Sequence, residues 1–279
     1  MSGATPSAGA GSAAPHTSPD LQPCMETRIR IRSEHVTRFR VLRLSALCRM
    51  FQEISIAHTT ALGMGREKTL DRGLLWIISR QYVEILRLPV YDEEITLRSW
   101  PGEMTGFFFP RFYEIWSGDE CIVRGEALWL LMEESTRKAV FPTAKGVVIE
   151  GVRGEAGKPA KTLAGAIRPP EGAEFFGEFP QEALFSRTDI NGHVGNAYYY
   201  DMIDDVLEED ALRRAPRIVE AEYLQEIRPG SRFLLRAMRQ PEPCGSRYFE
   251  GVAESFSRES GSSAAKPLFR IRTQYAGRG

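Results

Sequence analysis

The sequence is poor in the residues that mark secreted, membrane-spanning or zinc-binding proteins. Its four cysteines, Cys24, Cys48, Cys121 and Cys244, form no Cys-x-x-Cys pair and have no nearby histidine to complete a metal set. We therefore expect a reducing compartment and no metal site. No run of about eighteen apolar residues occurs. The N-terminus also lacks the basic region and apolar core of a signal peptide, so we predict a cytoplasmic protein with no membrane partner.

The chain also lacks an excess of charge of either sign. Its 36 Lys and Arg residues and 37 Asp and Glu residues give a net charge of -1. A uniformly basic surface is excluded, so we predict no nucleic-acid partner, and any basic docking surface must be local. Hydrophobic residues make up 42 % of the 279 residues. This composition is typical of a globular protein, and the length predicts about two domains.

Two segments are too poor in large apolar residues to form a core. Residues 1–24 are mostly Ala, Gly, Ser, Pro and Thr, and we expect a disordered tail there. Residues 151–180 are rich in Gly, Pro, Ala and charged side chains, which predicts an interdomain linker. Two domains remain, at residues 25–150 and 181–279.

The N-terminal domain begins with a strand near Thr27. Apolar residues then recur at helical spacing between Ser45 and Gly63, which predicts one long helix. Four strand-like runs follow, bounded by Pro and Gly turn signals, at residues 74–87, 94–100, 106–117 and 121–133. A helix followed by an antiparallel meander indicates the α+β class.

The C-terminal domain repeats this order. We predict a short strand at residues 185–190 and a helix from Val194 to about Asp210. Strands are expected at residues 217–227, 231–239, 247–256 and 267–275. The segments Gln81-Tyr-Val-Glu-Ile85 and Tyr223-Leu-Gln-Glu-Ile227 are similar, and each falls in the first strand after a helix. A tandem duplication explains this pattern better than two unrelated domains.

Polar residues gather where the second helix begins. Asp189, Asn191 and His193 alternate along the chain, so in an extended turn they can project to the same side. Free backbone amides at the start of a helix could hold an electron-rich carbonyl beside them. A carboxylate, an amide and an imidazole there suit acid–base chemistry. Alternatively, Asp189 or Asn191 caps the helix and His193 completes a buried hydrogen-bond network.

The pattern Asp-x-Asn-x-His-Val-x-Asn-x-x-Tyr, from Asp189 to Tyr199, resembles the acyl-acyl-carrier-protein (acyl-ACP) thioesterases of type II fatty acid synthesis. The later Glu222-Tyr-Leu-Gln-Glu226 and the tandem layout from Met25 to Tyr275 fit the same family. The resemblance implies tandem hotdog folds, each a long helix wrapped by an antiparallel β-sheet. It also implies hydrolysis of fatty acyl-ACP to free fatty acid and holo-ACP.

By this resemblance the catalytic residues are Asp189, Asn191, His193 and Glu226, and the N-terminal domain holds the acyl chain. No cofactor is implied, and the partner is acyl carrier protein, with the chain a monomer or a homodimer. Because the carrier is acidic, we expect basic docking residues, with candidates Arg213, Arg214, Arg217, Arg228 and Arg232.

Two positions depart from the family. Gly195 replaces a second Asn, and Ile227 stands where many plant members have Cys, so water rather than a cysteine should attack the thioester.

Glu226 could instead be an ordinary solvated strand residue, as most Glu residues are, and its counterpart Glu84 in the first half would fit a structural role inherited by both copies. In the first half, Leu42-Arg-Leu-Ser45 takes the place of the motif, so only the second half can be catalytic. Three alternatives remain: an acyl-CoA thioesterase of the hotdog superfamily, a hotdog hydratase, and a non-catalytic acyl-thioester-binding module. The hydratase motif is one residue longer and contains Pro, so the spacing disfavours it.

Overall fold

The computed structural model describes residues 23–149, 165–241, 245–253 and 266–276. The predicted tail at residues 1–24 therefore falls almost wholly outside the described residues. So does the first half of the predicted linker at residues 151–180. Both stay predictions.

The N-terminal half forms its predicted elements within a few residues. Its long helix is α1 (Leu44–Ala61), which buries one apolar face containing Leu47, Phe51 and Ile54. The strands are β1 (Met25–Arg30), β2 (Leu74–Ile85), β3 (Glu94–Pro101), β4 (Phe108–Ser117), β5 (Glu120–Glu133) and β6 (Lys138–Val140). Short 3-10 helices are η1 (Ser33–His35), η2 (Arg66–Lys68), η3 (Leu70–Arg72) and η4 (Pro142–Lys145).

The C-terminal half confirms four predicted strands and corrects two other elements. The confirmed strands are β8 (Ile218–Tyr223), β9 (Arg232–Arg239), β10 (Arg247–Ala253) and β11 (Pro267–Gln274). The strand expected at residues 185–190 is wrong, because η5 (Phe185–Arg187) and a turn lie there. The first strand is instead β7 (Glu174–Glu182), which begins inside the segment predicted as linker.

The single helix expected from Val194 to Asp210 is also wrong. Two short helices, α2 (Asn196–Asp204) and α3 (Glu209–Leu212), replace it. Glu209 and Asp210 lie in the first turn of α3, at the end of its helix dipole that favours negative charge.

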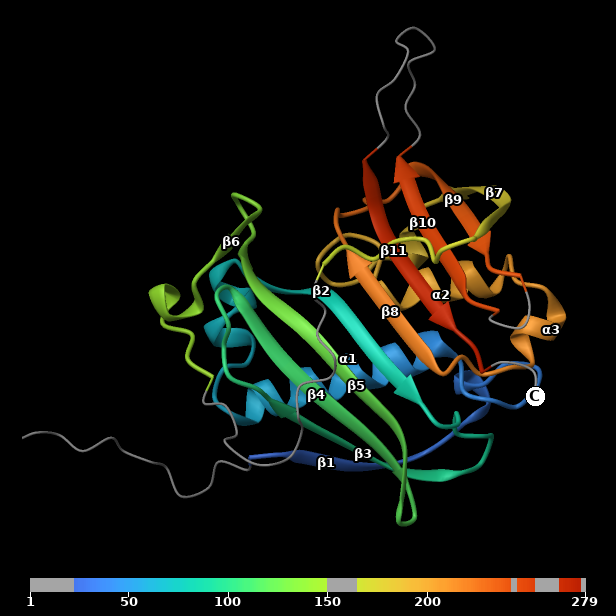
Figure 1. The fold of residues 1–279 in the computed structure, drawn as a ribbon. Helices are drawn as coiled ribbons and strands as arrows, with labels where there is room; N and C mark the ends of the chain where they lie inside the picture. The colour runs from blue at the N-terminus through green and yellow to red at the C-terminus, as the bar shows by residue number, and fades with distance from the viewer. Residues whose placement is uncertain (1–22, 150–164, 242–244, 254–265, 277–279) are drawn as a thin grey trace, which may run out of the picture.

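All strands of the described residues belong to one antiparallel sheet of order β1-β3-β4-β5-β2-β8-β11-β10-β9-β7, with β6 beside β5. The two halves meet where β2 pairs with β8, and α1 and α2 lie together behind the sheet (Figure 1). From this seam outward both halves have the same strand order. The structure therefore confirms the α+β class and the tandem hotdog arrangement, although the second helix has only nine residues.

The seam is fixed by buried polar groups on the helical side of the sheet. The Gln81 side-chain oxygen on β2 accepts hydrogen bonds from the hydroxyls of Tyr223 at 2.8 Å and Tyr200 at 3.4 Å. The Cys48 thiol on α1 donates to the same oxygen at 3.6 Å. Burial raises the pKa of Cys48 to about 12, so this thiol stays neutral and is a structural group.

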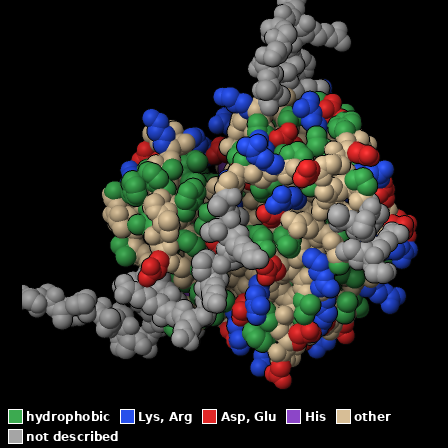
Figure 2. Space-filling view, viewed as in Figure 1, with side chains coloured by type: hydrophobic (Ala, Val, Ile, Leu, Met, Phe, Trp, Pro, Cys, Tyr) green, Lys and Arg blue, Asp and Glu red, His purple; other side chains and the backbone are tan. Residues whose placement is uncertain are grey.

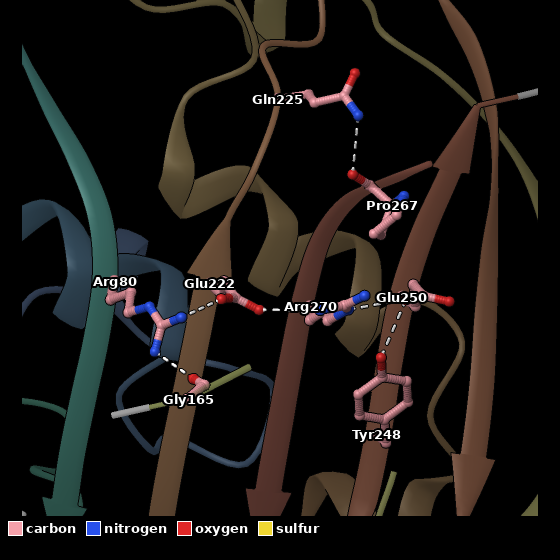
Figure 3. A network of polar contacts seen from close by, with 8 residues as sticks. All are labelled: Arg80, Gly165, Glu222, Gln225, Tyr248, Glu250, Pro267 and Arg270. Atoms are coloured by element: carbon pink, nitrogen blue, oxygen red, sulfur yellow. Dashed lines mark hydrogen bonds and ion pairs between the residues drawn. The ribbon is translucent and has the colours of Figure 1, made fainter. Parts of the chain in front are cut away.

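A network of ion pairs crosses the seam on the outer face (Figure 3). Glu222 on β8 pairs with Arg80 of β2 and, at 3.3 Å, with Arg270 of β11. Arg270 also bonds Glu250 of β10 at 3.0 Å. Acidic and basic side chains are intermixed over the visible part of this face (Figure 2). The network links four neighbouring strands and holds their register.

Candidate active site

The segment before α2 folds into a tight loop, which we call the motif loop (residues 189–193). The Asp189 amide donates to the His193 carbonyl at 2.9 Å, and the Gly192 amide donates back to the Asp189 carbonyl at 3.0 Å. Gly192 has φ 81°, a left-handed conformation that glycine adopts without strain. The Asp189 carboxylate accepts the Asn191 amide at 2.8 Å. Asp189 thus stabilises its own loop. It does not cap α2, because the N-cap residue of α2 is Gly195 and no side chain caps this helix.

The sequence predicted that Glu226 lies within a strand. In the structure Glu226 lies beyond the end of β8 instead. The amides of Leu224 and Gln225 both donate to the Leu268 carbonyl, at 2.9 and 3.0 Å, so two residues oppose one. Such a bulge redirects the side chains that follow it. The next residue, Ile227, accepts the Val194 amide at 2.8 Å. This bond ties the end of β8 to the motif loop.

These two segments place the His193 imidazole between two carboxylates. Its Nδ1 lies 3.8 Å from Asp189 Oδ1, and its Nε2 lies 3.5 Å from Glu226 Oε1. The His193 side chain is 12 % exposed, and its buried Nε2 makes no hydrogen bond to any described residue. The Asn191 side chain likewise makes no hydrogen bond within the described part of the chain. All four predicted site residues belong to these two adjoining segments.

Burial controls the charge of Asp189. Loss of solvent raises the pKa of the Asp189 carboxyl above its usual value, because burial disfavours the ionised form. The imidazole of His193 and the amide of Asn191 act in the opposite direction. Ionised Asp189 is therefore held at a free-energy cost, which is typical of functional carboxylates.

The structure adds one residue that the sequence did not indicate. Arg137, in the turn between β5 and β6, reaches from the N-terminal half to bond Glu226 Oε1 at 3.0 Å. Its backbone has φ 52°, an uncommon conformation for a residue with a side chain. Arg137 lies 89 positions from Glu226, and nothing in the sequence around it marks it as functional. Glu226 Oε1 is thus shared by a guanidinium and an imidazole.

The backbone amides at the start of α2 differ in availability. Those of Val194 and Gly195 already donate to the carbonyls of Ile227 and Arg187. The amides of Asn196 and Ala197, in the first turn of α2, donate to no acceptor among the described residues. These two N–H groups are the ones that could accept negative charge from a ligand.

The N-terminal half contains a second loop with the same backbone hydrogen bonds but without the carboxylate and imidazole of the motif loop. In this twin loop (residues 37–41), the Thr37 amide donates to the Val41 carbonyl at 2.9 Å, and the Arg40 amide donates to the Thr37 carbonyl at 2.9 Å. Arg40 has φ 63°, like Gly192 in the motif loop. The Leu42 amide bonds the Pro89 carbonyl at 2.8 Å, just as Val194 bonds Ile227.

This correspondence replaces the alignment expected from the sequence, which put Leu42–Ser45 opposite the motif and Glu84 opposite Glu226. The amides of Leu86 and Arg87 both donate to the Ile122 carbonyl, which repeats the bulge before Glu226. The structural counterparts are therefore Thr37 for Asp189, Phe39 for Asn191, Val41 for His193 and Leu88 for Glu226. The twin loop has lost every ionisable group of the motif.

Models of known protein families match both halves of the chain. The acyl-ACP thioesterase N-terminal domain matches residues 24–143, and the acyl-ACP thioesterase C-terminal domain matches residues 181–254. The chain belongs to the acyl-ACP thioesterase family. The resemblance inferred from the motif is confirmed.

Relatives of this thioesterase family come from plants and bacteria. The chain is 22 % identical over 268 residues to a chloroplastic acyl-(acyl-carrier-protein) hydrolase of Cuphea viscosissima, covering 88 % of this chain and 62 % of that one. It is 27 % identical over 190 residues to the chloroplastic dodecanoyl-(acyl-carrier-protein) hydrolase of Cinnamomum camphora, covering 62 % and 48 %. The chain therefore spans less than two thirds of these relatives.

Two solved acyl-ACP thioesterase structures share the double hotdog fold. The 12:0-ACP thioesterase of Umbellularia californica superposes with a TM-score of 0.68 at 18 % identity, covering 92 % of this chain and 98 % of that one. An acyl-ACP thioesterase of Bacteroides thetaiotaomicron gives 0.68 at 19 % identity, covering 90 % and 97 %. At these identities the likeness concerns the fold.

Proposed function

We propose that the protein hydrolyses fatty acyl-ACP thioesters to free fatty acid and holo-ACP. The observation that carries the proposal is the imidazole of His193 between the carboxylates of Asp189 and Glu226, beside free amides at the start of α2. Family membership and the names of the plant relatives support this choice of reaction. The catalytic residues are Asp189, Asn191, His193 and Glu226.

In the proposed reaction, Glu226 takes a proton from water, and the resulting hydroxide attacks the thioester carbonyl carbon. The N–H groups of Asn196 and Ala197 stabilise the oxyanion. The C–S bond then breaks, and His193 protonates the leaving thiolate. Asn191 orients the substrate with its side-chain amide, and Asp189 holds the geometry of the motif loop through its bond to the Asn191 amide. Arg137 fixes the Glu226 carboxylate.

The partner in this proposal is acyl carrier protein, and the chain needs no organic cofactor. Among the described residues, no group of three or more side chains is arranged to hold a metal ion. No helix in the described ranges is long and apolar enough to cross a membrane. A cytoplasmic location is part of the proposal, whereas the plant relatives are named chloroplastic. The choice between monomer and homodimer stays a prediction.

A thiol-release assay tests the proposal. Purified protein is given acyl-ACP and acyl-CoA series of matched chain length, and each of the four catalytic residues is changed to Ala in turn. We expect release from acyl-ACP to exceed release from acyl-CoA, and each variant to lose about a hundredfold or more in rate. Wild-type rates in all four variants would show that the site is wrong. Preferred turnover of acyl-CoA would indicate an acyl-CoA thioesterase, and binding without thiol release would indicate an acyl-binding module.

A further inference from the structure

A pocket of about 370 Å³ lies beside the twin loop and is lined by residues of both halves. We call it the arginine pocket. Its apolar lining residues, which we call the floor, include Val41, Leu86, Leu88 and Ala215. Four arginines line it, and no Asp or Glu does; these arginines are Arg87, Arg213, Arg214 and Arg217. A mostly apolar concavity with a few charged groups is the usual form of a small-molecule site.

The arginine pocket is the counterpart of the active site under the pseudo-twofold relation between the halves. Val41 and Leu88, in its floor, occupy the positions of His193 and Glu226. Tyr275, in its wall, directly follows β11, as the turn carrying Arg137 follows β5. In Figure 1 the end of β11, the segment leading into β8 and the loop before α1 converge here. The pocket therefore occupies the position of the catalytic site in the N-terminal half without its catalytic groups.

The arginines are held in place by the protein itself. Arg213 lies over the Phe39 ring of the twin loop at 4.4 Å, and Arg214 lies over the Tyr275 ring at 5.2 Å. Arg217 donates to the Leu86 carbonyl at 2.5 Å, and no carboxylate of any described residue forms an ion pair with it. Arg87 pairs with Glu93 and Arg213 pairs with Glu209, so Arg217 is the guanidinium in this pocket that has room for the carboxylate of a ligand.

We propose that the arginine pocket binds the free fatty acid product, with its carboxylate on Arg217 and its alkyl chain on the apolar floor. Guanidinium groups match carboxylates in geometry and charge. Replacement of His193 and Glu226 by Val41 and Leu88 makes the floor suited to an alkyl chain. The side chain of Leu86, 55 % exposed, lies in the same pocket. The identity of the ligand rests on the proposed function, but binding itself requires no turnover.

This interpretation differs from carrier docking on the predicted basic residues. Arg213, Arg214 and Arg217 line the pocket, whereas Arg228 and Arg232 do not. A carrier protein would contact a broad charged surface, while these three arginines surround an apolar concavity. A single carboxylate on an alkyl chain matches both features.

A photoactivatable dodecanoate carrying a diazirine tests the proposal on the full chain. After irradiation, mass spectrometry locates the labelled residues. We expect labelling at residues 86–88 and 215–217, and competition by dodecanoate but not by dodecanol. Leu86→Asp, which places a carboxylate in the pocket, and Arg217→Gln should each reduce this labelling about tenfold. Phe175→Asp is the control, because Phe175 is 60 % exposed on the edge strand β7.

Three results would overturn the proposal: pocket labelling unchanged in Leu86→Asp, equal competition by dodecanol, or competition by acyl carrier protein without competition by dodecanoate. Leu86→Asp changes an exposed side chain, so it remains informative even if Arg217→Gln does not fold. The test is separable from that of the proposed function. Labelling of an inactive protein would reject only the thioesterase reaction, and active protein without pocket labelling would reject only the second site.

Discussion

Changing Arg137 to Gln should slow the proposed reaction without unfolding the protein. The guanidinium bonds Glu226 Oε1 at 3.0 Å, and the substitution removes the cation that fixes this carboxylate. Coulomb's law with a dielectric constant of about 80 gives about 1.4 kcal/mol at this distance. A hydrogen bond to a charged group contributes about 1.5–3 kcal/mol. The side chains of Arg137 and Glu226 are 34 % and 24 % exposed, so solvent screening favours the low end of this range.

An interaction of about 1.5 kcal/mol corresponds to about a tenfold loss in kcat/KM. We expect the loss to fall on kcat, because Arg137 contacts the proposed base and not the acyl chain. Arg137→Lys, which restores a cation, should recover part of the rate. The assay is thiol release from acyl-ACP over a range of substrate concentrations, with thermal unfolding measured in parallel.

Lys145→Gln provides a matched control. The Lys145 and Glu133 side chains form a 2.8 Å pair with exposures of 35 % and 31 %, close to those of the Arg137 pair, and neither belongs to the proposed site. This variant should keep the wild-type kcat/KM. An Arg137→Gln variant as active as the wild type, or a Lys145→Gln variant equally impaired, would refute a positioning role for Arg137.

Two further predictions concern stability. Burial and the neighbouring Asp201 carboxylate raise the pKa of Asp204 from 3.8 to about 7, so ionising it in the folded state costs up to about 4 kcal/mol above pH 7. Asp204→Asn should therefore raise the unfolding free energy above pH 7, and this gain should vanish as pH falls towards 3.8. A constant gain at all pH values would show that the raised pKa of Asp204 is not its cause. Gly125→Ala should lower the unfolding free energy by about 1–3 kcal/mol in chemical denaturation, because the Cβ of the new alanine would lie 2.6 Å from the buried Phe51 ring. An unchanged denaturation midpoint would show that the ring can move.

Sequence patterning predicted most strands because each is a regular run of residues that alternate between the core and solvent. In β3, for example, Ile95, Leu97 and Ser99 are buried. Pattern failed where backbone geometry, and not burial, decides the structure. Residues 185–190 contain enough apolar side chains to suggest a strand, but η5 and the following turn belong to the hydrogen-bonded frame of the motif loop.

Three residues of the candidate site were predictable from one local motif, and Glu226 was predictable from the family resemblance. Asp189, Asn191 and His193 fall within five positions of each other, and local spacing places them together. Arg137 joins them only through tertiary structure. The twin loop was misaligned for a related reason: Thr37 and Val41 keep the hydrogen bonds of the motif loop without its side chains, and backbone bonds leave little trace in the sequence.

The joining of β2 to β8 within one chain has an evolutionary consequence. In a symmetric homodimer, a substitution that replaces histidine with valine appears in both sites and abolishes both. Here the two loops are encoded separately, so selection can act on one while the other drifts or acquires a new ligand. The continuous sheet keeps both halves folded throughout, since its seam depends on Gln81, Tyr223 and Glu222 and on neither loop.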